Sequence, residues 1–254
     1  MVRVLAGISS TYDLVRGRVM RFLICIFAVV LGACSRPADT PAPATAASPS
    51  QAATTPAAPA QPEPANESAA LTPEQLAHLV RPHSPVFGPA QAPVTVTEVL
   101  DPACAACKAF APVIEQLLFT YPEDVRVVVR YADFHPVSLQ ALRLLVAAQA
   151  QGKVHELLSA LFEHQEEWAS HTGPDPARAW KIAGDVGIDV RKAQKDALAA
   201  SVDNILQTEA DDLIALKVER TPTFFVNGKP LPTFGPQQLV DLVASEVQAA
   251  KSAK

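Results

Sequence analysis

Two cysteines three residues apart, Cys104 and Cys107, constrain this chain more than any other feature because of the segments on either side of them. Residues 94–100 alternate like a strand, and residues 104–119 carry apolar side chains at helical spacing. Both thiols therefore lie on the first turn of a predicted helix, where free N–H groups and the helix dipole lower a cysteine pKa from roughly 8.5 to about 3.5–7.5. We expect Cys104, nearer the helix start, to attack a disulfide and Cys107, one turn further in, to resolve the product.

The segments around this motif predict an α/β core. Residues 125–131 are β-branched and apolar, so strand, helix and second strand form a βαβ unit with parallel pairing and a right-handed crossover. Residues 223–226 predict a further strand, joined by the hairpin signal Asn227-Gly228 to residues 229–231. An amphipathic helix over residues 236–249 ends the pattern. Upstream, Thr72 as N-cap and Pro73 at the first helical position predict a short helix to about Val80.

Between the second and third strands the periodicity is entirely helical. Apolar residues recur at i, i+3, i+4 and i+7, with further helices predicted over residues 176–186, 189–199 and 202–217. We interpret residues 136–218 as an all-helical insertion that separates the two parts of the α/β domain, residues 72–135 and 219–254. We expect Trp168 and Trp180 to pack between helices, and the acidic pairs Glu166-Glu167 and Asp211-Asp212 to be solvated surface.

The N-terminal region has the pattern of an export signal. Met20-Arg21 precedes an apolar core over residues 22–33, too short to span a bilayer, which needs roughly 20 residues. We therefore assign residues 1–33 to a signal peptide and suspect that translation starts at Met20. The run Leu31-Gly32-Ala33-Cys34 resembles a bacterial lipobox, which implies that Cys34 is lipidated; a chance cysteine after an ordinary signal is the alternative. Ser35, in place of aspartate, favours the outer membrane.

Residues 34–71 predict a tether. Residues 36–70 contain eight prolines and no glycine, a composition that favours an extended spacer of roughly 3 Å per residue, on the order of 100 Å in all. Cys25 would leave with the signal and Cys34 would be acylated, so Cys104 and Cys107 remain as the free thiols. An exported protein meets an environment in which disulfides persist.

The order of motifs is more specific than any one of them. Thr221-Pro222 follows the cysteines by more than 100 residues, residues 88–93 lead into the first long strand, and His135-Pro136 follow the second. In this order they resemble the DsbA-like branch of bacterial thiol:disulfide oxidoreductases, in the thioredoxin superfamily, over residues 83–250. The resemblance implies a thioredoxin-like fold with an inserted all-helical domain, disulfide exchange with client proteins, and no cofactor.

The resemblance also implies roles for three further residues. Pro222 corresponds to the family's cis-proline, and the backbone of Thr221 would hydrogen-bond a client segment beside Cys104. The alternative is a trans proline that opens an edge strand. Glu98 occupies the position of a buried glutamate that exchanges a proton with Cys107; the alternative is a solvent-facing strand residue. The first reading is favoured if Val94, Val96 and Glu98 share a face.

The sequence departs from the most oxidising members of the branch. Their C-P-H-C motif places a histidine between the cysteines, whereas the side chains of Ala105 and Ala106 offer no donor. We therefore predict a Cys104 pKa higher than in those proteins, above about 4, and a more negative reduction potential. The direction of electron flow, oxidase or reductase, stays open.

Composition and histidine spacing exclude other classes. The net charge of −5 gives no basic footprint for nucleic acid. His155 and His164 are nine residues apart, and no histidine pairs with a second ligand at metal spacing, so we predict no metal site.

The sequence thus predicts a periplasmic, membrane-anchored monomer whose partners are client proteins with thiols or disulfides and a membrane redox protein that resets the dithiol. Two alternatives remain: a thioredoxin-fold metallochaperone that binds Cu(I) through the two thiolates, and a binding lipoprotein with a redox-inert, structural disulfide.

Overall fold

The computed structural model describes residues 70–253. The predicted signal over residues 1–33, the start at Met20, the lipidation of Cys34 and nearly all of the tether therefore lie outside the described residues.

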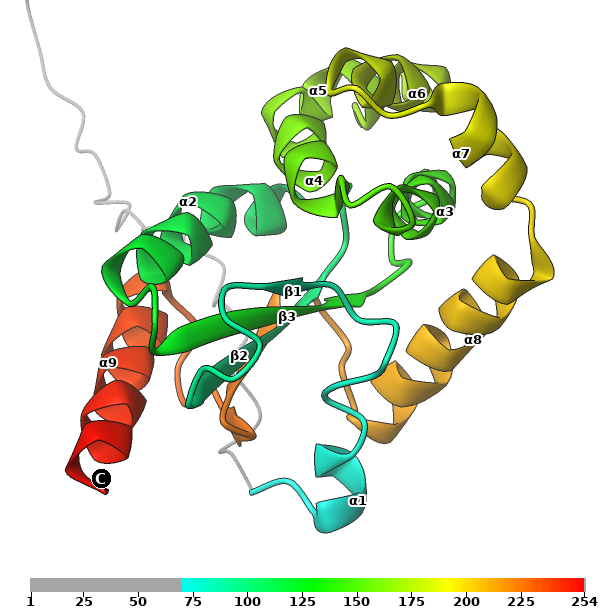
Figure 1. Cartoon of the computed structure of the whole chain (residues 1–254). Helices are drawn as coiled ribbons and strands as arrows, with labels where there is room; N and C mark the ends of the chain where they lie inside the picture. Colours follow the sequence, from blue (N-terminus) through cyan, green and yellow to red (C-terminus); the bar gives the residue numbers. More distant parts are fainter. Residues whose placement is uncertain (1–69, 254) are drawn as a thin grey trace, which may run out of the picture. The chain divides into compact units, whose positions relative to one another are not determined.

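The fold is organised around a five-stranded mixed sheet of order β1-β3-β2-β4-β5 (Figure 1). The central strands β2 (Val94–Leu100) and β3 (Val125–Tyr131) are parallel, and all other neighbours are antiparallel. Two of these neighbours, β4 (Thr223–Val226) and β5 (Lys229–Pro230), form the predicted hairpin. Because β2 and β3 run the same way, their carboxyl ends meet at one edge of the sheet, where the cysteines follow β2.

Strand β1 (Val86–Phe87) was not predicted. It pairs antiparallel with β3 at Val128 and Val127. Two residues are too few to show any periodicity, so the sequence pattern could not reveal this edge strand.

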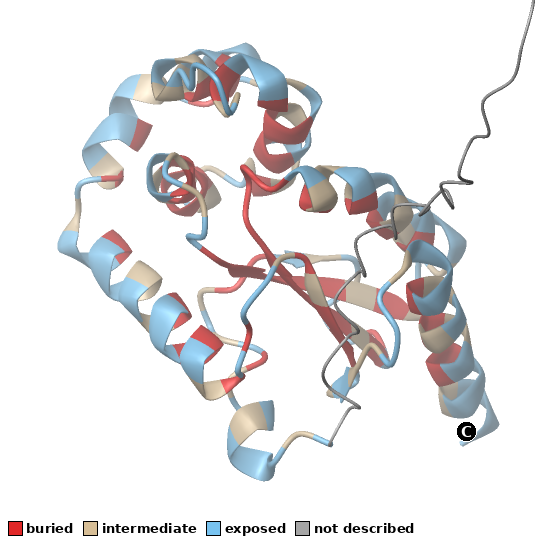
Figure 2. Cartoon of the chain, turned by 180° about the vertical axis from the view of Figure 1, so that it is seen from behind, coloured by how far each residue is buried: buried red, intermediate tan, exposed pale blue. Residues whose placement is uncertain are grey.

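One face of the sheet packs against α2 (Ala105–Thr120) and α9 (Pro236–Ser252) (Figure 1). Alternate residues of the strands point to this face, and Figure 2 shows the two central strands almost wholly buried. The opposite face is covered by the end of α8 (Ala200–Ala215) and by the arm that follows α1 (Pro73–Leu76). The core on the first face is formed mainly by Val94, Val96, Phe110, Ile114, Leu117, Val125, Val127, Phe224, Leu239 and Val243.

The predicted all-helical insertion lies between β3 and β4. It consists of α3 (Ser138–Gln149), α4 (Val154–Glu163), α5 (Gln165–Trp168), α6 (Pro176–Asp185), α7 (Val190–Asp196) and α8. Trp168 is fully buried and its indole N–H donates to the Leu161 carbonyl at 2.8 Å, as expected for a helix-packing residue. Glu166 and Glu167 are exposed, as predicted. The insertion therefore has a core of its own that continues into the carboxyl end of the sheet.

Helix α1 is shorter than predicted. Thr72 accepts from the Gln75 N–H in a capping box, as expected, but the helix ends at Leu76 rather than near Val80. The chain turns so that Leu79 packs on the sheet, and Pro82 disfavours helical backbone at Arg81.

The prediction that Asp212 is solvated is wrong. Arg130 of β3, itself 1% exposed, pairs with Asp212 at 2.6 Å and with Glu209 at 2.9 Å. Arg81 and His78 from the arm also contact the Asp212 carboxylate, and His83 contacts Glu209 at 2.9 Å. Periodicity along α8 identifies a helix face, but it gives no information on the strand arginine opposite that face. Asp211 is exposed, as expected.

Candidate active site

The turn that carries the cysteines is held by the buried carboxylate of Asp101. It accepts hydrogen bonds from the backbone N–H groups of Ala103 and Phe134, both at 2.8 Å, from His135 Nδ1 at 2.9 Å, and from the Ser138 hydroxyl. Asp101 thus fastens the start of α2 to the segment that leaves β3. Its role was missed from the sequence, although aspartate before proline is a known turn signal.

The helical insertion also holds this turn. The side-chain amide of Gln165, on α5, donates to the carbonyls of Pro102 at 3.0 Å and Cys104 at 3.1 Å. Gln165 is buried, so the two bonds form away from solvent. No signal in the sequence connects this glutamine with a turn some sixty residues upstream, and only the tertiary structure reveals the contact.

The two thiols differ in position and exposure. Cys104 is the N-cap of α2, with extended backbone, and Cys107 lies in the first helical turn. Cys104 keeps 7% of its surface exposed, whereas Cys107 has none. Both are free thiols in the structure. A reagent or a client sulfur can therefore reach Cys104, but it cannot reach Cys107 without displacing other atoms.

The pKa of Cys104 is lowered to about 5, mainly because the Cys107 thiol hydrogen-bonds its sulfur. The Thr221 side chain and the backbone N–H groups of Cys107 and Ala106 act in the same direction, while partial burial opposes them. Ala106, whose side chain offers no donor, thus still supplies a backbone donor. Burial, followed by the bond to Cys104, raises the pKa of Cys107. At neutral pH these shifts favour a thiolate at Cys104 beside a protonated thiol at Cys107.

Thr221 and Pro222 lie beside the reactive sulfur, as the sequence predicted. The peptide bond between them is cis, and the Cys104 thiol donates to the Thr221 carbonyl at 3.3 Å. Thr221 itself is half-buried.

Glu98 lies on the face of β2 that packs against α2, together with Val94 and Val96. It is 4% exposed, and burial raises the pKa of its carboxyl to about 8, with no opposing cation or hydrogen bond among the described residues. The charge of Glu98 contributes to the raised pKa of Cys107, which indicates that the two side chains are close. The buried carboxyl and the buried thiol thus influence each other electrostatically.

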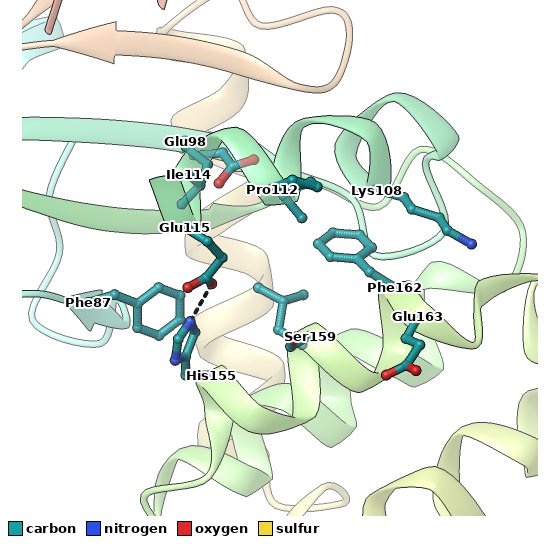
Figure 3. A pocket seen from close by; sticks show the side chains of 12 residues that line it. Phe87, Glu98, Lys108, Pro112, Ile114, Glu115, His155, Ser159, Phe162 and Glu163 are labelled. Carbon is teal, nitrogen blue, oxygen red and sulfur yellow. Dashed lines mark hydrogen bonds and ion pairs between the residues drawn. The ribbon is translucent and has the colours of Figure 1, made fainter. Parts of the chain in front are cut away.

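A pocket of about 280 Å³ between α2 and α4 includes Glu98 in its lining. Figure 3 shows the carboxylate in a lining that mixes apolar side chains, such as Ile114 and Phe162, with polar ones, such as Ser159 and Glu163. Near these lies the ion pair of His155 and Glu115, at 2.7 Å. The buried carboxyl therefore lies at a cavity rather than in close-packed core.

Two further observations bear on the alternatives. Within residues 70–253 no group of three or more His, Cys, Asp or Glu side chains is placed to hold a metal ion. In the same part of the chain, every helix is too short or too polar to span a membrane.

The sheet order and the dithiol at the start of α2 define the class of thioredoxin-like oxidoreductases. A family model described as "Thioredoxin" matches residues 81–243, and the chain belongs to this family.

Solved structures have the same fold. A thioredoxin-like oxidoreductase from Silicibacter pomeroyi DSS-3 is 25% identical with a TM-score of 0.59, and the match covers 70% of this chain and 99% of that chain. Wolbachia pipientis alpha-DsbA1 is 16% identical with a TM-score of 0.62, covering 70% and 98%. BdbD from Bacillus subtilis is 21% identical with a TM-score of 0.59, covering 65% and 94%. The fold is therefore that of the DsbA-like members.

The relatives found by sequence comparison are named as antiporters and not as oxidoreductases. Na(+)/H(+) antiporters NhaA 1 from Mycobacterium sp. (strain KMS) and NhaA 3 from Salinispora tropica are each 31% identical, over 162 and 172 residues. These matches cover 59% and 66% of this chain but 25% of either antiporter. The chain thus spans about a quarter of the length of these relatives, and the antiporter name refers to those whole proteins.

Proposed function

We propose that this protein is a thiol:disulfide oxidoreductase that exchanges disulfides with client proteins through Cys104 and Cys107. The observation that carries the proposal is the asymmetry of the dithiol: a partly exposed sulfur with a pKa near 5 beside a fully buried thiol. A structural disulfide would need no such difference, whereas exchange needs one attacking and one resolving thiol.

In the reducing direction, the Cys104 thiolate attacks one sulfur of a client disulfide. A Cys104–client disulfide forms, the client S–S bond breaks, and the released client thiolate takes a proton from solvent. Cys107 then transfers its proton to the Glu98 carboxylate and attacks the Cys104 sulfur. The Cys104–client S–S bond breaks, and the released client thiolate takes a proton from solvent while Glu98 returns its proton to solvent. The products are a Cys104–Cys107 disulfide and a second client thiol, so two electrons pass to the client. The reverse sequence oxidises a client dithiol.

Glu98 and Thr221 support these steps. A carboxyl with a pKa near 8 is close to the working pH, so it can both accept and return the proton of Cys107. The Thr221 carbonyl lies 3.3 Å from the Cys104 sulfur, where the backbone of an extended client could pair with Thr221 as a strand does.

The place of action rests on the sequence. We propose that the chain is exported, lipidated at Cys34 and held off the membrane by the tether over residues 34–71. Its partners there would be client proteins and a membrane redox protein that restores the dithiol or disulfide, and the protein would act as a monomer. Mass spectrometry of the mature N-terminus tests this: we expect an acylated Cys34, and an unmodified or different first residue would contradict it.

The function is tested by trapping. A Cys107→Ala variant can form the mixed disulfide but cannot resolve it, so it should accumulate a Cys104–client disulfide with a disulfide-containing peptide. A Cys104→Ala variant is the matched control and should trap none. Equal trapping by both variants, or by neither, would contradict the proposal. The steady-state redox form in cells then gives the direction: mostly oxidised for a disulfide donor, mostly reduced for a reductase.

A further inference from the structure

A second cavity, of about 500 Å³, lies between α3, α8 and the carboxyl end of β3. It shares no lining residue with the pocket at Glu98. Three large apolar side chains in its lining are exposed: Phe134 at 43%, Leu139 at 40% and Ile214 at 77%. Single exposed apolar residues are ordinary, but three around one cavity form a patch that favours contact with another apolar group.

Tyr131 also lines this cavity, and its hydroxyl has no protein partner. The residue is 1% exposed, and among residues 70–253 its hydroxyl is the single buried side-chain oxygen or nitrogen without a hydrogen bond. Native proteins pair nearly all such groups. An unpaired hydroxyl at a cavity is therefore suited to donate to a ligand that carries a carbonyl oxygen.

The cavity is connected to the reactive sulfur by short, well-defined segments. Asp101 binds the N–H of Phe134, in the cavity lining, with one carboxylate oxygen and the N–H of Ala103, in the cysteine turn, with the other. On the other side, Val218 lines the cavity three residues before Thr221. Three residues span at most about 11 Å, so the cavity lies within that reach of the carbonyl beside Cys104.

We propose that this cavity binds an apolar side chain of the client polypeptide, three or four residues from the client cysteine that is joined to Cys104. An extended client covers roughly 3.3–3.6 Å per residue, so a side chain three residues away reaches about 10 Å from the mixed disulfide. The Tyr131 hydroxyl donates to a backbone carbonyl of the same segment. The proposal rests on the proposed function, and it assigns to the cavity the selection of clients with an apolar residue at this spacing.

The charges at the cavity agree with an apolar guest. Arg143 and Asp203, both in the lining, pair with each other, and Glu209 is engaged by Arg130. Of the charged side chains in the lining, Asp133 alone makes no ion pair among the described residues, so the cavity offers no free cation to an anionic guest.

The test measures peptide entry onto Cys104. In the Cys107→Ala background, Cys104 is converted to its disulfide with 5-thio-2-nitrobenzoate. The thiolate of a single-cysteine peptide attacks the Cys104 sulfur and releases the coloured thiolate, so the rate is read directly. Each peptide of the set carries a single leucine, whose position is varied before and after the cysteine, and serine at all other positions. We expect leucine three or four residues from the cysteine to raise the second-order rate about tenfold over an all-serine peptide. No preference, or a preference only next to the cysteine, would overturn the proposal.

Matched substitutions test whether the leucine preference arises at this cavity. Phe134→Ser and Ile214→Ser should abolish the leucine preference, whereas Phe119→Ser and Leu198→Ser, at side chains 84% and 79% exposed and outside this lining, should keep it. Equal losses in all four variants would contradict the assignment. Glutathione, which carries no such side chain, serves as the small thiol. Failure of glutathione to react would count against the proposed function, whereas a normal glutathione rate without leucine preference would count against the cavity alone.

Tyr131→Phe tests the hydroxyl. Because that group has no protein partner, its removal should leave the melting temperature unchanged or raise it, while the rate with the leucine peptide falls about three- to tenfold. A lower melting temperature with an unchanged peptide rate would instead show a structural role.

Discussion

Two buried carboxyl groups on opposite faces of the sheet behave in opposite ways. Glu98 faces α2, while Asp212 pairs with Arg130. Arg130 lies opposite Val99 in the register of β2 and β3, and Val99 points to the other face of the sheet from Glu98. Glu98 is 4% exposed and Asp212 is 2% exposed, so burial is nearly equal. The difference lies in their partners.

Burial raises the pKa of Glu98 to about 8 because nothing opposes it. Burial also acts on Asp212, but hydrogen bonds from Arg81, Arg130 and His78 outweigh it and hold the pKa of that carboxyl well below its usual range. An uncompensated carboxyl can exchange a proton near neutral pH, whereas a compensated one stays charged and links segments. The comparison shows that partners, rather than depth, decide whether a buried acid is reactive or structural.

The largest expected effect comes from breaking the compensated site. Arg130→Met leaves Asp212 and Glu209 buried without their shared cation, which should lower the free energy of unfolding by about 3–5 kcal/mol. Chemical denaturation measures this loss. Arg143→Met is the control, because Arg143 pairs with an Asp203 side chain that is 55% exposed, and its loss should cost about 1 kcal/mol or less. Equal losses for the two variants would contradict the account.

The second effect concerns catalysis at the uncompensated site. Glu98→Gln keeps the shape but removes the proton acceptor for Cys107, so resolution of the mixed disulfide should slow roughly 100-fold at neutral pH. Stopped-flow kinetics of resolution measures this. The attack by Cys104 should change little. Glu115→Gln, in the same pocket, is the control and should resolve at the parent rate; if Glu98→Gln does so too, Glu98 has no proton role.

The third effect is the pH dependence of stability. The pKa of Glu98 is higher in the folded than in the unfolded protein, so its contribution is fully present below about pH 4.5 and declines as the pH rises towards about 8. The slope for one group is at most about 1.4 kcal/mol per pH unit. The stability difference between the parent and Glu98→Gln should show this decline; a flat difference would show that Glu98 titrates normally. Asp212 has the opposite sign, since its contribution is present above about pH 3.8 and is lost as the pH falls.

These two sites also show what the sequence could predict. Val94, Val96 and Glu98 alternate on one strand, so periodicity places Glu98 on the face of the two valines, whereas its burial was predicted only from the family resemblance. The position of the thiols at the start of α2 and the parallel pairing of β2 with β3 could also be predicted, because both follow from the strand, helix and strand periodicity of residues 94–131.

Asp212 could not be predicted because its partner Arg130 is 82 residues away in sequence and contacts it only in the folded chain. The hydrogen bonds from Gln165 to the cysteine turn and the short strand β1 could not be predicted for the same reason, because neither leaves a local signal in the sequence. The backbone donor at Ala106 has no sequence signal for another reason: every residue type except proline carries a backbone N–H.

The asymmetry of Cys104 and Cys107 is the centre of this account, and the pH profile of alkylation tests it most directly. The reduced protein is treated with iodoacetamide over a range of pH, and mass spectrometry assigns the modified residue. We expect a midpoint of about 5 for Cys104 and no modification of Cys107 while the protein is folded. A midpoint near the ordinary value of about 8.5, or equal modification of the two thiols, would contradict it.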